Sequence, residues 1–174
     1  MKHKNLLFGL GAALLFAASL CCDKDDPIEK QEASIDSYIR TKMDRNPSLK
    51  LLRDGSVSYL YLPGDSAAPA VSPGDSLYII YTGVLLADTS RCFVTNDIEV
   101  AAALGMDTVS GNFAPLGVAV GEGKLIKGLD SGLKMAHPKD KGEIIFNSDY
   151  GFGNKAVGIV PAYSALIYKL VISG

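Results

Sequence analysis

The sequence has no tryptophan and few residues that bind metals: two histidines and three cysteines among 174 residues. Because His3 and His137 lie far apart and cysteine is sparse, we expect no metal site. Two cysteines adjoin an apolar leader, which leaves Cys92 alone in the rest of the chain. We therefore expect no intramolecular disulfide and interpret Cys92 as a small buried hydrophobic residue. His137, in a polar stretch, is interpreted as an ordinary surface histidine.

The sequence also lacks a large excess of positive or negative charge. The 17 lysines and arginines stand against 19 acidic residues, for a net charge of −2, and no basic stripe is present. A nucleic acid is therefore not expected as a partner. With 48% hydrophobic and 21% charged residues, the composition is typical of one soluble domain with additional segments.

The chain begins with an apolar leader. Lys2, His3 and Lys4 precede residues 6–20, which are apolar or small apart from Ser19. This is the pattern of a secretory signal, and it is short for the alternative, a retained transmembrane helix. Cys21-Cys22 and an acidic run follow, an arrangement that resembles a bacterial lipoprotein signal. Because Leu20 precedes Cys21 where a small residue is preferred, we predict lipidation at Cys22, with Cys21 as the alternative.

This lipoprotein resemblance implies a location. Residues 1–21 would be the signal peptide, and a lipid on the next residue would anchor the protein to the outer membrane of the cell envelope. The run Lys24-Asp25-Asp26 is similar to the signal that sends lipoproteins of the Bacteroides type to the cell surface. Exposure at the surface is therefore a further expectation.

One amphipathic helix is predicted next. Asp26-Pro27 suits a helix start, with Glu29 placed as in a capping box, and Asn46-Pro47 stops the helix. Between them, apolar residues recur at a helical spacing, at Ile35, Tyr38, Ile39 and Met43. We expect this narrow face to pack on its own domain, which favours a monomer; a dimerisation helix is the alternative. Residues 22–56 are accordingly assigned to a tether and this helix, and residues 57–174 to one domain.

The remaining pattern predicts an α+β fold. Alternating or short apolar runs indicate strands at 57–62, 77–86, 92–95 and 116–120, whereas residues 97–113 fit neither a helical nor a strand period. From Gly121 onward, the order is a tight turn, a short helix, a strand at 143–146, a glycine-rich loop and a strand at 165–172. This order indicates one helix packed on a mostly antiparallel sheet.

Four segments then carry a family resemblance. They are Tyr81-Thr82-Gly83, residues 121–128 (Gly-x-x-x-Leu-Ile-Lys-Gly), Asp149–Gly153 and Gly158–Pro161. Their order and spacing resemble the FKBP-type peptidyl-prolyl cis-trans isomerases, or rotamases, from Val71 to Ile172. The resemblance implies an FKBP-like twisted antiparallel sheet wrapped on one short helix. It also implies an isomerase without a cofactor that helps exported, proline-containing polypeptides to fold.

The resemblance also assigns the site. The catalytic positions would be Tyr81, Ile126, Leu129, Phe152 and Tyr168. The substrate-binding positions would be Phe93, Val94, Leu116, Val118, Leu125 and Val160. The Ile126 N–H would donate to a ligand carbonyl, and the apolar residues would form a cup for the proline ring. Rotation about the prolyl bond needs a site that binds the twisted amide best, and neither a nucleophile nor a strong acid.

Several positions depart from the family pattern. Leu129 stands where tryptophan is usual, and Leu116 where an aromatic residue is usual. Phe152 replaces a ligand-binding tyrosine, and Val94 replaces an acid. A lost hydrogen bond is worth about 1 kcal/mol net, so these losses together would weaken the site. The alternative function is therefore a catalytically weak or inactive FKBP-like lipoprotein that binds a peptide or a partner protein.

Overall fold

The computed structural model describes residues 26–64, 68–69 and 71–173. The elements in chain order are α1 (Pro27–Arg45), β1 (Lys50–Asp54), β2 (Val57–Leu62), β3 (Ser76–Leu85), β4 (Cys92–Thr95), α2 (Ile98–Ala103), β5 (Leu116–Ala119), α3 (Lys127–Leu133), β6 (Lys141–Phe146), the 3-10 turn η1 (Ser148–Tyr150) and β7 (Leu166–Ser173). The predicted leader and the two candidate lipidation residues, Cys21 and Cys22, lie outside the described residues. Within the described ranges, no helix combines the length and hydropathy needed to cross a membrane.

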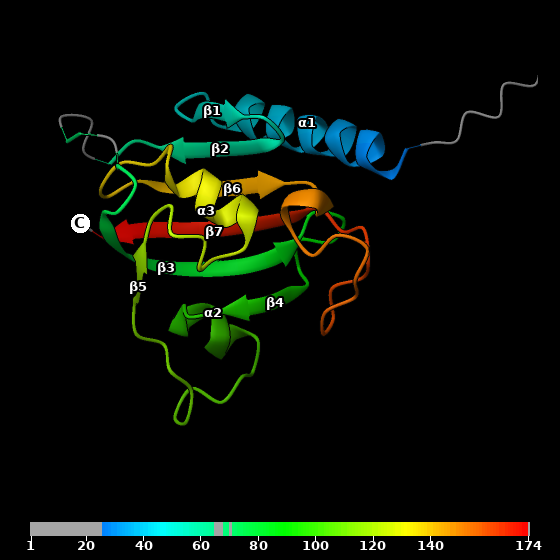
Figure 1. Ribbon diagram of the computed structural model, residues 1–174. Coiled ribbons are helices and arrows are strands. Elements are labelled where there is room, and N and C mark those ends of the chain that lie inside the picture. The colour runs from blue at the N-terminus through cyan, green and yellow to red at the C-terminus, as the bar shows by residue number, and fades with distance from the viewer. Residues whose placement is uncertain (1–25, 65–67, 70, 174) are drawn as a thin grey trace, which may run out of the picture.

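The described strands form one seven-stranded sheet in which every pair is antiparallel. Their order is β1-β2-β6-β7-β3-β4, and β5 pairs with the first half of β3, next to β4 (Figure 1). The last strand, β7, is therefore central, with β6 on one side and β3 on the other. This sheet with its few helices confirms the predicted α+β class.

The helix α1 packs on one face of this sheet. Asp26 caps it by accepting a hydrogen bond from the Ile28 N–H at 2.9 Å, so the predicted start is confirmed. Ile35 and Ile39 are buried against a cluster that includes Leu60, Ile145 and Ile167. The apolar face of α1 is thus covered by its own sheet.

The short helix α3 packs on the opposite face. Side chains alternate along a strand, so Ile144 and Phe146 point to the α3 side of β6 and Ile145 points to the α1 side. A Cβ atom at Gly128 would lie 2.3 Å from the Phe146 ring, and one at Gly132 would lie 2.3 Å from Ile144. Glycine at these two positions therefore allows α3 to approach β6 closely.

Two elements were not predicted from the sequence. The strand β1 pairs with β2 along its whole length, and it lies in the 22–56 segment that we assigned to a tether and helix. The helix α2 lies in the region without a clear period, where the Asp97 carboxylate caps it by accepting from the Glu99 and Val100 N–H groups.

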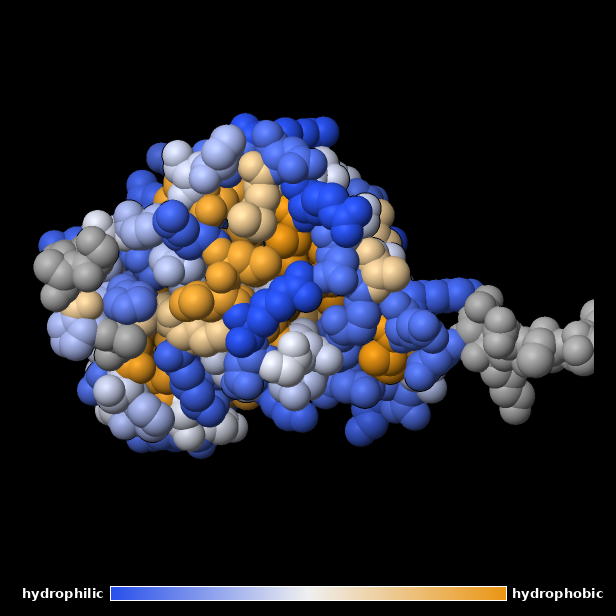
Figure 2. Space-filling model, turned by 90° about the horizontal axis from the view of Figure 1, so that it is seen from above, coloured by the Kyte–Doolittle hydropathy of each residue, from blue (hydrophilic) through white to orange (hydrophobic). Residues whose placement is uncertain are grey.

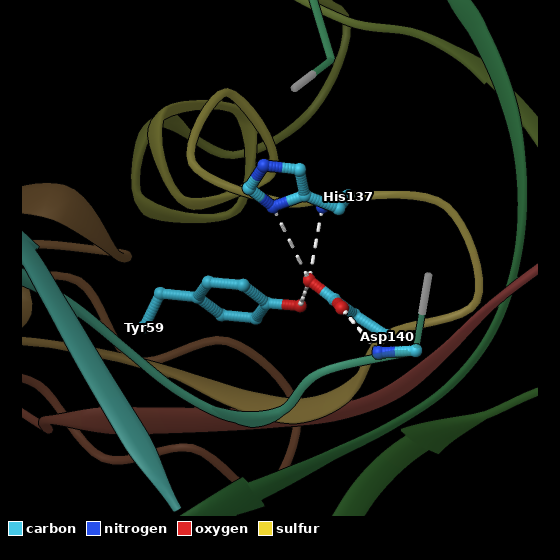
Figure 3. Close-up of polar contacts among 4 residues, drawn as sticks. Tyr59, His137 and Asp140 are labelled. Carbon is cyan, nitrogen blue, oxygen red and sulfur yellow. Dashed lines mark hydrogen bonds and ion pairs between the residues drawn. The ribbon is translucent and has the colours of Figure 1, made fainter. Parts of the chain in front are cut away.

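A buried carboxylate holds the end of β2 to the turn before β6 (Figure 3). Asp140 is 1% exposed and accepts hydrogen bonds from the Tyr59 hydroxyl at 3.1 Å and from the Gly64 and His137 N–H groups, each at 2.9 Å. The His137 ring nitrogen Nδ1 lies 3.8 Å from the same carboxylate. His137 is therefore half-buried beside an acid, and our expectation of an ordinary surface histidine was wrong.

Candidate functional site

An apolar cluster between α3 and the sheet contains most of the predicted site residues. Its buried members include Val118, Leu129, Val160 and Tyr168. Half-buried residues packed against it include Tyr81, Phe93, Val94, Leu125, Ile126 and Phe152. Leu116 is not part of this cluster and is 39% exposed on β5. The fold thus brings residues from β3, β4, β5, α3, β7 and the glycine-rich loop into one place.

Aromatic rings form one wall of the site, with Tyr168 at its centre. The Tyr168 ring centroid lies 5.7 Å from that of Phe93, in an edge-to-face arrangement, and 6.0 Å from that of Tyr81. Phe146 stacks on Tyr168 at 6.0 Å from below, and Phe152 meets Phe93 edge-on at 6.2 Å. Such ring pairs each add to the stability gained from burial, so the wall is held from several directions.

Most of the predicted site residues line two hollows rather than one, and Tyr81, Ile126 and Leu129 line neither. The first, of about 480 Å³, is lined by residues of β4, β7 and the glycine-rich loop, among them Phe93, Val94, Phe152, Val160 and Tyr168. The second, of about 540 Å³, lies beside β5 and is lined by residues including Leu116, Val118 and Leu125. Both volumes are large enough for a few residues of peptide. Leu129 is a buried member of the apolar cluster.

The start of α3 offers a backbone donor. Ile126 is the residue before α3, and its carbonyl accepts the first hydrogen bond of the helix, from the Asp130 N–H at 3.0 Å. The N–H of Ile126 makes no hydrogen bond to a described residue, as is usual at the start of a helix. Asp130 in turn accepts from the Gly121 N–H at 2.8 Å, which holds the preceding turn against α3. The donor that the family resemblance implies is therefore free to bind a carbonyl.

Tyr168, a predicted catalytic position, brings a second donor, its hydroxyl, which the sequence did not indicate. Burial, and to a smaller extent the neighbouring Tyr81, raise the pKa of Tyr168 above its usual range, so its hydroxyl stays protonated. This hydroxyl bonds to no described residue. Because no fully buried side-chain nitrogen or oxygen in the described part of the chain lacks a partner, it must be reached by solvent. We conclude that the hydroxyl opens into the hollow.

Asn96 positions Tyr81 and was missed from the sequence. It is 6% exposed, and its Oδ1 accepts from the Tyr81 N–H at 2.6 Å. Its Nδ2 donates to the carbonyls of Ile79 and Ala114 at 3.0 and 3.1 Å. Asn96 therefore ties β3 to the segment before β5. Its partners lie 15 to 18 residues away in the chain, and no local pattern indicates such a contact.

A separate groove of about 470 Å³ lies on the other face of the sheet, between the end of α1 and α2. Figure 2 shows apolar residues gathered in a hollow on the side seen from above, bordered by hydrophilic ones. The lining mixes aliphatic residues such as Leu60 and Val171 with Lys42, Glu143 and Lys169. Glu143 accepts from the Lys42 ammonium at 2.8 Å and from the Tyr38 hydroxyl at 2.9 Å. Of the predicted site residues, this groove contains Tyr81 alone.

Comparison with known proteins identifies the family. The model of FKBP-type peptidyl-prolyl cis-trans isomerases matches residues 68–172. The chain belongs to this family. Its activity class is accordingly that of a peptidyl-prolyl cis-trans isomerase, and the matched range runs from the segment before β3 into β7, so that it leaves out α1, β1 and β2. In the part of the chain that the structure describes, no group of three or more histidine, cysteine, aspartate or glutamate residues could hold a metal ion.

Individual relatives agree with this assignment. The FKBP-type chain is 31% identical over 106 residues to FK506-binding protein 1 of Aspergillus oryzae, covering 60% of this chain and 85% of that protein. It is 29% identical over 96 residues to FK506-binding protein 2 of Aspergillus fumigatus, covering 55% and 61%. The crystal structure of FkpA from Escherichia coli superposes with a TM-score of 0.56 at 17% identity and covers 84% of this chain. The match spans 60% of FkpA and supports the fold alone.

Proposed function

We propose that this FKBP-type protein is a lipid-anchored isomerase that accelerates rotation about Xaa-Pro bonds of exported polypeptides at the outer membrane. The observation that carries the proposal is an apolar cluster that contains Tyr168 and is packed against Ile126, with two donors that no described residue occupies. These donors are the Ile126 N–H and the Tyr168 hydroxyl.

The proposed mechanism is binding of the twisted amide. Resonance gives the prolyl bond a barrier of roughly 18–20 kcal/mol, and a twisted amide has lost that resonance. An apolar cup stabilises this state relative to both planar forms, because the twisted carbonyl carries less charge. The proline ring would contact Tyr168, and the Ile126 N–H would hold a peptide carbonyl. No bond is made or broken, so no acid, base or nucleophile takes part.

The Tyr168 hydroxyl supports catalysis despite the departures from the family pattern. Val94 and Phe152 line the same hollow as Tyr168 and supply no polar side-chain atom there. A protonated hydroxyl on β7 gives the hollow a side-chain donor from a different direction. We therefore propose that Tyr168 takes over part of the peptide binding that the replaced acid and tyrosine would provide.

A second function remains a specific alternative. Because Val94, Leu129 and Phe152 remove polar or aromatic groups from the family pattern, the domain would then bind a peptide or partner protein without accelerating exchange. Weak binding of macrolide ligands is expected under either function.

Prolyl exchange measured by NMR on a set of Xaa-Pro peptides, with residues 23–174 and no lipid, separates the two functions. Ile126→Pro is the sharpest variant, because Ile126 has φ −61°, a value that proline adopts, and only its N–H is lost from the backbone. Ile126→Ala, which keeps the N–H, is the matched control. Isomerase function predicts accelerated exchange that Ile126→Pro and Tyr81→Ala abolish. Exchange at the uncatalysed rate, restored in part by Phe152→Tyr with Val94→Asp, would establish the binding module instead.

The anchoring part of the proposal rests on the leader and on Cys21-Cys22. Replacing Cys22 with serine is expected to release the protein from the membrane fraction and to abolish labelling with a fatty acid, and Cys21→Ser is the control. The reverse result would place the lipid on Cys21. Digestion of intact cells with an added protease then tests exposure at the surface.

The apolar face of α1 is covered by its own sheet, which supports a monomer. Sedimentation of the unlipidated protein tests this oligomeric state.

A further inference from the structure

The N-terminal helix contacts the turn that leads into the site. Gln31 is 9% exposed; its Oε1 accepts from the Ser148 N–H at 2.7 Å and its Nε2 donates to the Ser148 Oγ at 3.1 Å. The neighbouring Glu32 accepts from the Asn147 Nδ2 at 2.6 Å. Two consecutive residues of α1 thus bind two consecutive residues of the turn, 115 to 117 positions away in the chain.

The same turn determines where Phe152 lies. The Ser148 carbonyl accepts from the N–H groups of both Gly151 and Gly153, at 2.9 and 2.8 Å. Phe152 stands between these two glycines, and its ring lines the hollow and meets Phe93. A displacement of Ser148 would therefore move the backbone on both sides of Phe152.

No residue of the turn could replace the two hydrogen bonds that Gln31 makes to Ser148. Ser148 is fully buried, and no residue of η1 accepts from its N–H. A buried N–H without a partner is costly, so loss of the Gln31 side chain would favour a rearranged turn. The buried apolar residues of α1, Ile35 and Ile39, belong to a different cluster, on the α1 side of the sheet.

We propose that Gln31 is a positioning residue of the isomerase: by holding Ser148, the first turns of α1 place Phe152 in the substrate hollow. Because Gln31 lies only five residues after Asp26, where the tether meets the helix, substrate binding is coupled to the docking of this end of α1. The proposal rests on the isomerase function proposed above. The hydrogen bonds from Gln31 to Ser148 are the physical basis of this coupling.

Gln31→Leu, which keeps the size of the side chain and loses both bonds, tests the proposal. We expect kcat/KM for Xaa-Pro peptides to fall about three- to tenfold, chiefly through KM, because a small misplacement within a site weakens binding and catalysis. The NMR amide shifts of Gly151 and Gly153 should change, and the Ser148 amide should exchange with solvent faster. Gln31→Glu is the rescue variant, because a carboxylate accepts from both the N–H and the hydroxyl of Ser148.

The matched control is Ile39→Val, which weakens α1 docking at the other cluster without touching the turn. The proposal predicts a loss of stability there with unchanged kcat/KM and unchanged glycine shifts. Equal effects of Gln31→Leu and Ile39→Val, or unchanged shifts in Gln31→Leu, would overturn it. Should Gln31→Leu fail to fold, Ser148→Ala removes only the Oγ contact and should give a smaller change of the same kind.

The test separates this proposal from the isomerase function. If the wild-type protein does not accelerate prolyl exchange, the proposed isomerase function fails. The amide shifts of Gly151 and Gly153 and the titration of an Xaa-Pro peptide then still report on the position of Phe152. Weaker peptide binding by Gln31→Leu than by Ile39→Val would then support the positioning role in a binding module. Equal binding by the two variants would refute it.

Discussion

Tyr168 has an apolar ring and a polar hydroxyl with different surroundings, and the sequence pattern alone does not distinguish them. Its ring contacts Tyr81, Phe93 and Phe146, while its hydroxyl opens into the hollow. The alternation of β7 and the family resemblance predict an inward ring at this position. They cannot predict the free hydroxyl, nor the bond between Asn96 and the Tyr81 backbone, because both depend on which distant residues surround the group.

Replacing Tyr168 with phenylalanine keeps the ring and removes the hydroxyl. We expect kcat/KM for Xaa-Pro peptides to fall about fivefold, in line with a hydrogen bond worth about 1 kcal/mol. The free energy of unfolding should change little, because the hydroxyl bonds to no described residue. NMR exchange and urea unfolding measure the two quantities. Tyr163→Phe, at a position that is 53% exposed and lines neither hollow, is the control, and a similar fall there would contradict the role of the Tyr168 hydroxyl.

The buried carboxylate of Asp140 gives a second prediction for a single residue. All three partners donate to the carboxylate, and only the Tyr59 hydroxyl could rotate to accept a hydrogen bond instead. Asp140→Asn would point an amide NH₂ at one of the N–H groups, so we expect a loss of about 2–3 kcal/mol in the free energy of unfolding. Tyr59→Phe removes one donor and should cost less. Equal stability of Asp140→Asn and the wild type in urea would show that the network is not needed.

At the level of elements, the strands with strong alternation or a clear apolar run were predicted closely. β2 and β4 match their expected ranges, β3, β5 and β7 differ by one residue at their ends, and β6 begins two residues earlier than expected. β1 was missed because four of its five residues are exposed, which removes the alternation that indicates a strand. α2 has six residues, too few for a helical period, and only its capping residue Asp97 indicated a start.

The close approach of α3 to β6 predicts which glycines can be replaced. In Gly128→Ala the new methyl group would meet the Phe146 ring at 2.3 Å, so we expect a loss of about 1–3 kcal/mol in stability, together with weaker peptide binding because Leu129 moves. At Gly117 the nearest atom would lie at an ordinary 3.4 Å. Gly117→Ala should therefore be nearly neutral in thermal unfolding, and a comparable loss at both positions would be inconsistent with close packing of α3.

At the level of the whole molecule, buried tyrosines limit stability at high pH. Burial raises the pKa of Tyr38 to about 12, with Glu143 adding to the shift. Burial also raises the pKa of Tyr59, next to Asp140, and that of Tyr168. Unperturbed tyrosine ionises near pH 10, so above that pH the unfolded chain releases protons that the folded chain retains.

Stability should accordingly stay constant with respect to these tyrosines below about pH 10 and fall as the pH rises through 12. Circular dichroism follows unfolding, and the ultraviolet absorbance of tyrosinate follows ionisation. The two transitions should coincide for the buried groups. Ionisation of every tyrosine near pH 10 while the sheet remains folded would contradict the burial of these side chains.

The position of β7 has a consequence for the time at which the protein can fold. Residues 166–173 are the last strand described, yet they join β1, β2 and β6 to β3, β4 and β5. A chain still emerging from a ribosome or a translocation channel therefore holds two half-sheets with no strand between them, and pairings this distant in sequence form slowly. The wall formed by Tyr168 is completed by the same strand. The site therefore stays incomplete until β7 has been made and has paired with both β3 and β6.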